Sequence, residues 1–265
     1  SEILSFGTAG CNLGCKFCQN WTMSKARLDD LNAHAVSPDG VVALAKKHFT
    51  PSIAYTYNDP TIFAEYVIDI SKLAREEGIR SVMVTAGYID KNARKDVYKY
   101  IDAANVDLKA FSEQFYHKLT FSHLNDVLDT LLWLKNETDV WIEITNLLIP
   151  QENDSDEEIQ QMCDWIVTNL GESVPLHFTA FHPDFKMRDK TRTPDSTLHT
   201  ARAIALSTGI KYCYLGNILD ERSQATYCPQ CKKTLISRDW HSVDRNIIED
   251  GKCPDCGTVI AGVFE

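Results

Sequence analysis

Short apolar runs alternate along the chain with longer segments whose apolar residues recur every three or four positions. The short runs predict seven strands, at residues 3–6, 53–57, 81–85, 104–108, 140–147, 176–181 and 211–215. The longer segments predict six helical regions, at residues 37–48, 61–77, 92–101, 112–136, 157–170 and 194–207. End signals support several of them, because Ser37 and Pro38 suit a helix start and Gly78 and Gly209 suit helix ends.

Strands and helices that alternate about 25 to 40 residues apart indicate right-handed crossovers and a parallel sheet. Polar side chains gather at the carboxyl ends of the predicted strands, and in a parallel barrel these ends share the face that carries the active site. The pattern therefore predicts an α/β fold, a partial (β/α)6 TIM-type barrel. A doubly wound open sheet is the alternative, weakened because no Gly-x-Gly-x-x-Gly sequence follows any predicted strand.

Cys11, Cys15 and Cys18 follow the first predicted strand with the spacing Cys-x3-Cys-x2-Cys, in a segment that we call the cysteine loop (residues 10–18). Its two glycines disfavour a regular helix or strand, so the segment can wrap and direct three thiolates at one point. Three thiolates leave one iron of a 4Fe–4S cluster without a protein ligand and open to a substrate or cofactor. A structural zinc site favours four protein ligands, and buried free cysteines do not suit so polar a run. We therefore expect a cluster here.

Four further cysteines form two Cys-x2-Cys pairs, Cys228 with Cys231 and Cys253 with Cys256, separated by 21 residues. This spacing is close to that of a zinc ribbon. About forty residues cannot bury a sufficient core, so a bound metal must supply much of the folding free energy. We expect structural zinc, with rubredoxin-type iron in the same thiolates as the alternative. The predicted organisation is a barrel at residues 1–218 and a small zinc-ribbon or rubredoxin-like unit at residues 225–265.

The chain has 265 residues, with 27 Lys and Arg against 37 Asp and Glu, and a formal net charge of −10. Binding of nucleic acid or of anionic membranes would favour a basic face, so neither is an expected partner. The apolar runs are too short to span a bilayer, and no signal-peptide pattern precedes the first strand. Seven of the nine cysteines lie in metal-ligand spacings, which predicts a reducing, cytoplasmic location. The start on an apolar strand is compatible with a missing N-terminal extension.

The cysteine loop, with the aromatic Phe17 just before its third cysteine, resembles the signature of radical S-adenosylmethionine (SAM) enzymes. Further matches lie at residues 55–61, 84–89, 178–187 and 214–217 and in the terminal cysteine pairs. Together they resemble the AmmeMemoRadiSam system radical SAM enzymes, relatives of the pyruvate formate-lyase (glycyl radical enzyme) activating enzymes. The resemblance covers nearly the whole chain.

This resemblance implies that the open iron chelates SAM and that residues at the strand ends orient it. Asn58 and Asp59 lie where the family receives the methionine amino group, Lys109 in Asp107-Leu108-Lys109 resembles a lysine that contacts the SAM carboxylate, and His182 resembles a histidine near SAM. The remaining residues expected to bind the cofactor are Phe17, Thr85, Gly87, Asp107, Glu143 and Asn217.

Two of these expectations rest partly on the residues themselves. Asp59 departs from the family's usual glutamate, and Asp59 before Pro60 also suits a helix N-cap, so both roles stay open. Asp107 and Lys109 alternate with Leu108 and therefore share one face of a strand, where charged groups are costly unless they are paired or bound. Glu143 is expected on an inward face as well, toward ribose or substrate.

The implied reaction is reductive cleavage of SAM to methionine and a 5′-deoxyadenosyl radical, which abstracts hydrogen from an unidentified substrate. The implied partners are a flavodoxin- or ferredoxin-like one-electron reductant and, from the family name, Memo-type and AMMECR-type proteins. Activation of a glycyl radical enzyme is one alternative. A non-catalytic, metal-stabilised binding module is another, and the missing fourth ligand near the three cysteines weighs against it.

Overall fold

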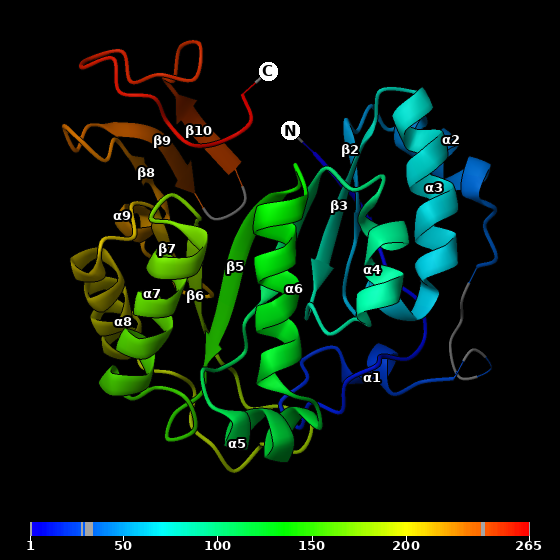
Figure 1. Cartoon of the computed structure of the whole chain (residues 1–265), viewed down its shortest axis with the longest axis horizontal. Coiled ribbons are helices and arrows are strands. Elements are labelled where there is room, and N and C mark those ends of the chain that lie inside the picture. Colours follow the sequence, from blue (N-terminus) through cyan, green and yellow to red (C-terminus); the bar gives the residue numbers. More distant parts are fainter. Residues whose placement is uncertain (1, 28, 30–33, 240–241, 265) are drawn as a thin grey trace. The chain divides into compact units, whose positions relative to one another are not determined.

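A computed structural model describes residues 2–27, 29, 34–239 and 242–264 of the chain (Figure 1). Its main sheet has seven parallel strands in chain order. The strands are β1 (Leu4–Phe6), β2 (Ser52–Tyr55), β3 (Arg80–Thr85), β4 (Ala103–Asp107), β5 (Trp141–Leu148), β6 (Leu176–Ala180) and β7 (Cys213–Gly216). The predicted α/β fold, a partial TIM-type barrel, is thereby confirmed. The doubly wound alternative is wrong, because a doubly wound sheet reverses its strand order at one point, whereas the observed order follows the chain from β1 to β7.

Helical segments connect successive strands, as the periodicity predicts. They are α1 (Trp21–Ser24), α2 (Pro38–Lys47), η2 (Pro60–Phe63), α3 (Ala64–Glu76), α4 (Lys91–Tyr98), α5 (Glu113–Phe115), η3 (Tyr116–Thr120), α6 (Leu124–Glu137), α7 (Asp156–Leu170), α8 (Asp195–Thr208) and α9 (Glu221–Gln224). Within the described ranges, no helix is long and apolar enough to cross a membrane.

The chain divides into two compact units, and each is described by itself. The first unit contains residues 1–108, 113–142 and 183–189, and therefore β1 to β4 with α2, α3 and α4. Tyr55 on β2 is fully buried there, and its hydroxyl lies 2.7 Å from the Ser71 hydroxyl. Alternation along the predicted strand places Tyr57 on the same face as Tyr55 and predicts that both rings pack in the barrel. However, β2 ends at Tyr55, and Tyr57 is 48% exposed with φ 71°. The packing role predicted for Tyr57 is therefore wrong.

The second unit contains residues 109–112, 143–182 and 190–265, with β6, β7, α7, α8 and most of β5. Ser155 caps α7, because its hydroxyl accepts a hydrogen bond from the Glu158 amide at 3.2 Å. Glu158 does not complete a reciprocal capping box. Its carboxylate accepts from the Phe111 amide at 2.7 Å, and burial raises the pKa of Glu158.

The C-terminal part of the second unit is a three-stranded antiparallel sheet made of β8 (Thr226–Tyr227), β9 (Thr234–Asp239) and β10 (Ser242–Asn246). Its small core joins Cys228 and Cys253 to the apolar residues Leu235 and Ile260 and to Tyr212, which directly precedes β7. The Tyr212 hydroxyl also accepts a hydrogen bond from the Ala261 amide at 3.1 Å. The cysteine-bearing segment is thus packed onto the start of β7.

Candidate functional site

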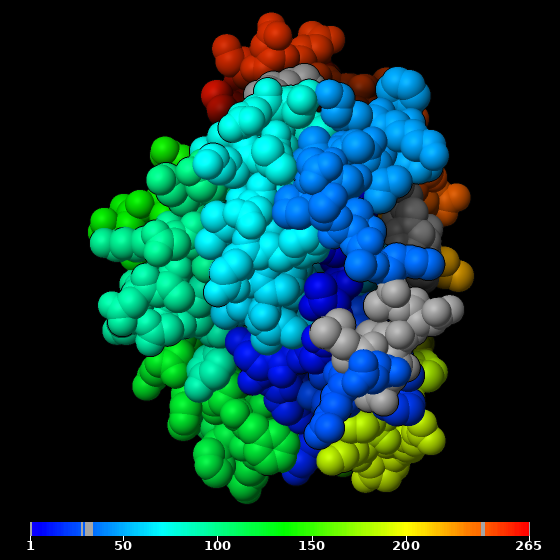
Figure 2. All heavy atoms as spheres, turned by 90° about the vertical axis from the view of Figure 1, so that its right-hand side faces the viewer, coloured from blue at the N-terminus to red at the C-terminus, as the bar shows by residue number. Residues whose placement is uncertain are grey.

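The cysteine loop follows β1 and is held mainly by backbone hydrogen bonds. The Gly14 amide donates to the Thr120 carbonyl at 2.8 Å, and the Lys16 amide donates to the Leu119 carbonyl at 2.9 Å. Gly14 is a required glycine, since a Cβ there would lie 2.5 Å from the Phe121 ring. Figure 2 shows the dark blue N-terminal segment reaching the surface of the first unit.

The three thiols of this loop suit a cluster better than a single ion. Cys15 is buried, while Cys11 and Cys18 are half-buried. Three thiolates fall one short of the four protein ligands that a structural zinc site favours, whereas they leave one iron of a 4Fe–4S cluster open to another ligand. The Cys18 sulfur lies 3.1 Å from the Ser24 hydroxyl, a donor that would stabilise a thiolate.

An aromatic contact covers the loop from a segment far away in sequence. The Trp21 ring stacks on Phe185 at 5.5 Å between centroids, and its indole N–H donates to the Asp184 carboxylate at 3.1 Å. The Lys186 amide donates to the Lys16 carbonyl at 3.0 Å. The local sequence pattern does not predict these contacts, because it indicates only a loop at residues 183–189, after β6.

Phe17 is expected to bind the cofactor, and the structure places its ring in the core. It is 4% exposed and its ring lies 5.6 Å from that of Phe115. Phe17 therefore anchors the loop between Cys15 and Cys18, and its contact with a cofactor stays a prediction.

Asn58 lies against the start of the cysteine loop. Its side-chain amide donates to the Gly10 carbonyl at 2.7 Å and to the Thr8 hydroxyl at 3.2 Å, and its side-chain oxygen accepts from the Thr8 amide at 3.1 Å. A Cβ at Gly7 would lie 2.4 Å from the Thr56 carbonyl oxygen, so Gly7 is needed for this close approach. The contacts of Asn58 are those of a residue that positions the loop.

The Asp59 carboxylate is buried, with 4% exposure, and has three partners in the first unit. One oxygen accepts from the Thr61 amide at 2.9 Å and so caps η2, as the Asp-Pro sequence predicts. The other accepts from the Thr85 hydroxyl at 3.0 Å and from the Ala86 amide at 2.8 Å. The carboxylate therefore links the start of η2 to the end of β3.

Thr85 and Gly87 continue this network at the end of β3. The Gly87 amide donates to the Thr85 hydroxyl oxygen at 3.1 Å. Gly87 has φ +66°, and a Cβ there would lie 2.9 Å from Val106, so both conformation and space call for glycine. Tyr98 is buried beside this network, and the lack of solvent raises the pKa of its phenol.

Asp107 and Lys109 lie at the end of β4 and directly after it, on the half-exposed face that alternates with the buried Val106 and Leu108. Because β4 ends at Asp107, the strand face that the sequence predicts for both residues stays a prediction. Asp107 belongs to the first unit and Lys109 to the second, where the Lys109 carbonyl accepts from the Asn153 side chain at 2.7 Å.

The other predicted cofactor residues lie in the second unit. His182 is exposed two residues after β6, and Asn217 follows β7 with φ +59° and a side-chain amide that donates to the Ala180 carbonyl at 3.0 Å. The sequence pattern places Glu143 late in its strand, and that placement is wrong, because it is the third of the eight residues of β5. Its carboxylate lies 2.6 Å from Nε2 of His177 on β6.

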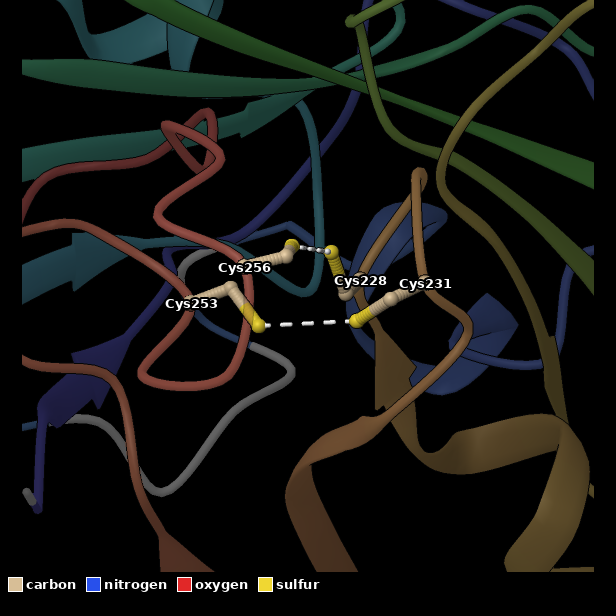
Figure 3. Close-up of side chains that lie close together, drawn as sticks. All are labelled: Cys228, Cys231, Cys253 and Cys256. Carbon is tan, nitrogen blue, oxygen red and sulfur yellow. Dashed lines mark hydrogen bonds between the residues drawn. The ribbon is translucent and has the colours of Figure 1, made fainter.

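The four C-terminal cysteines form a compact metal site (Figure 3). Their sulfurs all lie within 4.8 Å of one another, with 3.6 Å between Cys228 and Cys256 and 3.7 Å between Cys231 and Cys253. These separations far exceed a disulfide bond of about 2.05 Å and are close to the roughly 3.8 Å between thiolates in a tetrahedral zinc site. The four thiols therefore fit one tetrahedral ion, with no position left open.

Comparison with known proteins adds family information to this geometry. The sequence model described as the Radical SAM superfamily matches residues 6–166. The Methanocaldococcus jannaschii protein MJ0808 is 37% identical over 98% of this chain and 78% of its own length. The pyruvate formate-lyase-activating enzyme of Clostridium pasteurianum is 27% identical over 68% of this chain and 80% of its own length. The structure of Streptococcus suis SuiB bound to its precursor peptide SuiA has a similar fold, with a TM-score of 0.63, 14% identity, and coverage of 82% of this chain and 48% of SuiB.

Proposed function

Because the chain belongs to the Radical SAM superfamily, we propose that it is a radical SAM enzyme whose cluster ligands are Cys11, Cys15 and Cys18. When bound, a 4Fe–4S cluster would cleave SAM reductively to methionine and a 5′-deoxyadenosyl radical, which abstracts hydrogen from a substrate that is not identified. The observation that carries the proposal is a three-cysteine loop fixed at the end of β1, within the segment that matches the family.

The surrounding residues support this chemistry by holding the loop and SAM in place. Asn58 positions the loop through Gly10 and Thr8, and Asp59 positions the end of β3. The proposed contacts with SAM come from residues that the family resemblance indicates, namely Phe17, Thr85, Gly87, Asp107, Lys109, Glu143, His182 and Asn217. For Asp59 we propose positioning, because both of its carboxylate oxygens already accept hydrogen bonds, from Thr61, Thr85 and Ala86.

Production of 5′-deoxyadenosine tests this function. Protein reconstituted anaerobically with iron and sulfide is mixed with dithionite and SAM, and the nucleoside is measured by liquid chromatography. Cys15→Ala should abolish both the cluster's visible absorption and the product. Cys163→Ala is the matched control, because burial raises the pKa of Cys163 to about 12 and keeps it a neutral core thiol. If Cys15→Ala produces as much 5′-deoxyadenosine as the wild type, the catalytic proposal fails.

At the finer level we propose the AmmeMemoRadiSam type, with a flavodoxin- or ferredoxin-like reductant and with Memo-type and AMMECR-type proteins as partners. The terminal cysteine pairs and the packing of residues 183–189 on the cysteine loop support this assignment. Copurification of a tagged chain with co-encoded Memo-type and AMMECR-type proteins tests it, and the recovery of neither partner would count against it.

Activation of a glycyl radical enzyme is the second candidate, favoured by the similarity to an activating enzyme of Clostridium pasteurianum. Its signature is a glycyl radical, detected by electron paramagnetic resonance on a co-encoded partner after incubation with SAM and reductant. A radical on the partner would replace the first assignment with the second.

We further propose that residues 1–218 carry the radical chemistry and that residues 225–265 form a structural four-cysteine unit containing zinc, or iron in the rubredoxin manner. Metal analysis of the Cys15→Ala protein as isolated distinguishes them. This variant should lack the proposed 4Fe–4S cluster, so visible iron–thiolate absorption would come from the C-terminal site, whereas zinc there is colourless. All nine cysteines are free, which supports a reducing, cytoplasmic location.

A further inference from the structure

The second unit contains a cavity of about 460 Å³ that is lined in part by residues of β5, β6 and β7. Its polar lining comes from Glu143, His177, Tyr214, Asn217, Gln224 and Arg238. The volume lies within the range of about 300–1,000 Å³ that is typical of small-molecule sites. All the lining residues belong to this one unit, and they come from the parallel strands and from the C-terminal segment.

The strand side of the cavity is a row of three stacked or bonded side chains. Glu143 and His177 are joined at 2.6 Å, and their side chains are 35% and 28% exposed. The His177 ring stacks on Tyr214 at 5.1 Å between centroids, with an interplanar angle of 27°. The Tyr214 hydroxyl is bonded to Thr226 at 3.0 Å, and burial raises the pKa of Tyr214, so the phenol is neutral.

Arg238 supplies a positive charge from the other side of the cavity. It lies on β9, and one of its terminal nitrogens, Nη1, donates to the Gln224 carbonyl at 2.8 Å and to the Thr226 hydroxyl at 2.9 Å. Both partners are neutral, and among the described residues no carboxylate forms an ion pair with Arg238. The guanidinium lies 5.7 Å from the Tyr214 ring centroid, which orients it without neutralising it.

The C-terminal metal site explains how Arg238 is held there. β9 lies between β8 and β10, and its Leu235 belongs to the small core that contains Cys228 and Cys253. The same core includes Tyr212, directly before β7. A bound metal therefore fixes the sheet that carries Arg238 against the strand that carries Tyr214.

We propose that this cavity binds a small organic anion, a carboxylate or a phosphate ester, through the guanidinium of Arg238. Within the described part of the chain, the hydrogen bonds of Arg238 are made by Nη1, so Nε and Nη2 can donate to a ligand, and this fork matches the bidentate geometry of both anions. The Glu143 carboxylate is hydrogen-bonded to His177 at 2.6 Å. The Glu143–His177 pair supplies polar contacts for the remainder of the ligand, and the stacked rings supply an apolar surface.

This inference goes beyond the proposed radical function. The cavity shares Glu143 and Asn217 with the proposed SAM contacts, but anion binding through Arg238 requires neither the cluster nor SAM. The test uses full-length protein without reconstitution and measures binding by isothermal titration calorimetry. The probes are benzoate, its neutral analogue benzamide, and inorganic phosphate. We expect wild-type protein to bind benzoate or phosphate and to bind benzamide more weakly, and the tighter of the two anions identifies the ligand class.

Arg238→Gln should weaken anion binding about ten- to a hundredfold, the usual effect of losing a charged hydrogen-bond partner. Arg245→Gln is the matched control, because Arg245 is exposed on β10 of the same sheet and does not line the cavity. It should bind as the wild type does. Arg238→Lys keeps the charge without the planar fork, should bind with intermediate affinity, and serves the comparison if Arg238→Gln does not fold.

Three results would overturn the proposal: wild-type protein that binds neither anion at millimolar concentration, an affinity for benzamide that equals that for the tighter of the two anions, or unchanged anion affinity in both Arg238 variants. Loss of 5′-deoxyadenosine formation in the separate cluster assay would leave the binding result unaffected, so the two proposals fail independently.

Discussion

Replacement of Asp59 by alanine separates a structural role of this carboxylate from direct contact with SAM. The substitution removes the acceptor that caps η2 at Thr61 and leaves the buried Ala86 amide without its partner. Loss of an N-cap costs about 0.5–2 kcal/mol, and a buried unsatisfied donor costs about 1–3 kcal/mol. The free energy of unfolding should therefore fall by about 2–5 kcal/mol.

Asp90→Ala is the matched control in the same unit. Asp90 also caps a helix, since its carboxylate accepts from the Asn92 amide at 2.8 Å, but this contact is exposed. Its loss should cost only the capping contribution, about 0.5–1 kcal/mol. Asp59→Asn should lie between the two, because it retains an oxygen for the cap and presents an NH₂ group to the Ala86 amide.

Urea unfolding, followed by circular dichroism, provides the free energies, and calorimetric titration of the reconstituted proteins provides the SAM affinities. A difference of less than about 0.5 kcal/mol between Asp59→Ala and Asp90→Ala would refute the structural reasoning, because it is within the usual additivity error. So would unchanged stability of Asp59→Asn combined with a tenfold loss of SAM affinity, which is the outcome expected for a carboxylate that touches the ligand.

Two further predictions concern the first unit. Gly87→Ala should destabilise by about 1–3 kcal/mol more than Gly78→Ala, because both have φ near +70° but only Gly87 would place its Cβ against a neighbouring side chain; equal losses in chemical denaturation would contradict this. Asp129 has a lowered pKa, chiefly because Arg94 donates to it at 2.7 Å. A carboxyl group with a lower pKa in the folded state stabilises the folded protein above the unfolded value of about 3.9, and this stabilisation is lost as the pH falls. The stability of the wild type should therefore fall more steeply below about pH 4 than that of Asp129→Asn. Parallel profiles of stability against pH would argue against the ion pair.

Much of the fold follows from local patterns in the chain. The alternation of apolar runs with helical periodicity placed all seven strands in the right order, because each element has a face whose spacing is set within a few residues. The helix start at Asp59 is equally local, because Asp59 before Pro60 predicts an N-cap and the structure has one there. Cysteine spacing alone also separated the three-thiol loop from the four-thiol metal site, which the structure gathers within 4.8 Å.

Contacts between distant segments are a different matter, since no local spacing encodes them. Trp21 finds Asp184 and Phe185 across more than 160 positions, and the second oxygen of Asp59 reaches the end of β3. Glu143 shows the limit most clearly. The alternation of residues predicts the strand face on which Glu143 lies. Its position along β5 and its pairing with His177 depend on the register of β5 against β6.

The cavity beside Arg238 depends on the tertiary structure for the same reason. In sequence, Arg238 is one charged residue in a polar segment near the end of the chain. Only the packing of the cysteine-bearing segment onto the start of β7 carries its guanidinium to Tyr214 and the neighbouring strands. Cysteine spacing thus determines that a metal can fold this segment, while the apolar contacts around Tyr212 determine where its charge lies.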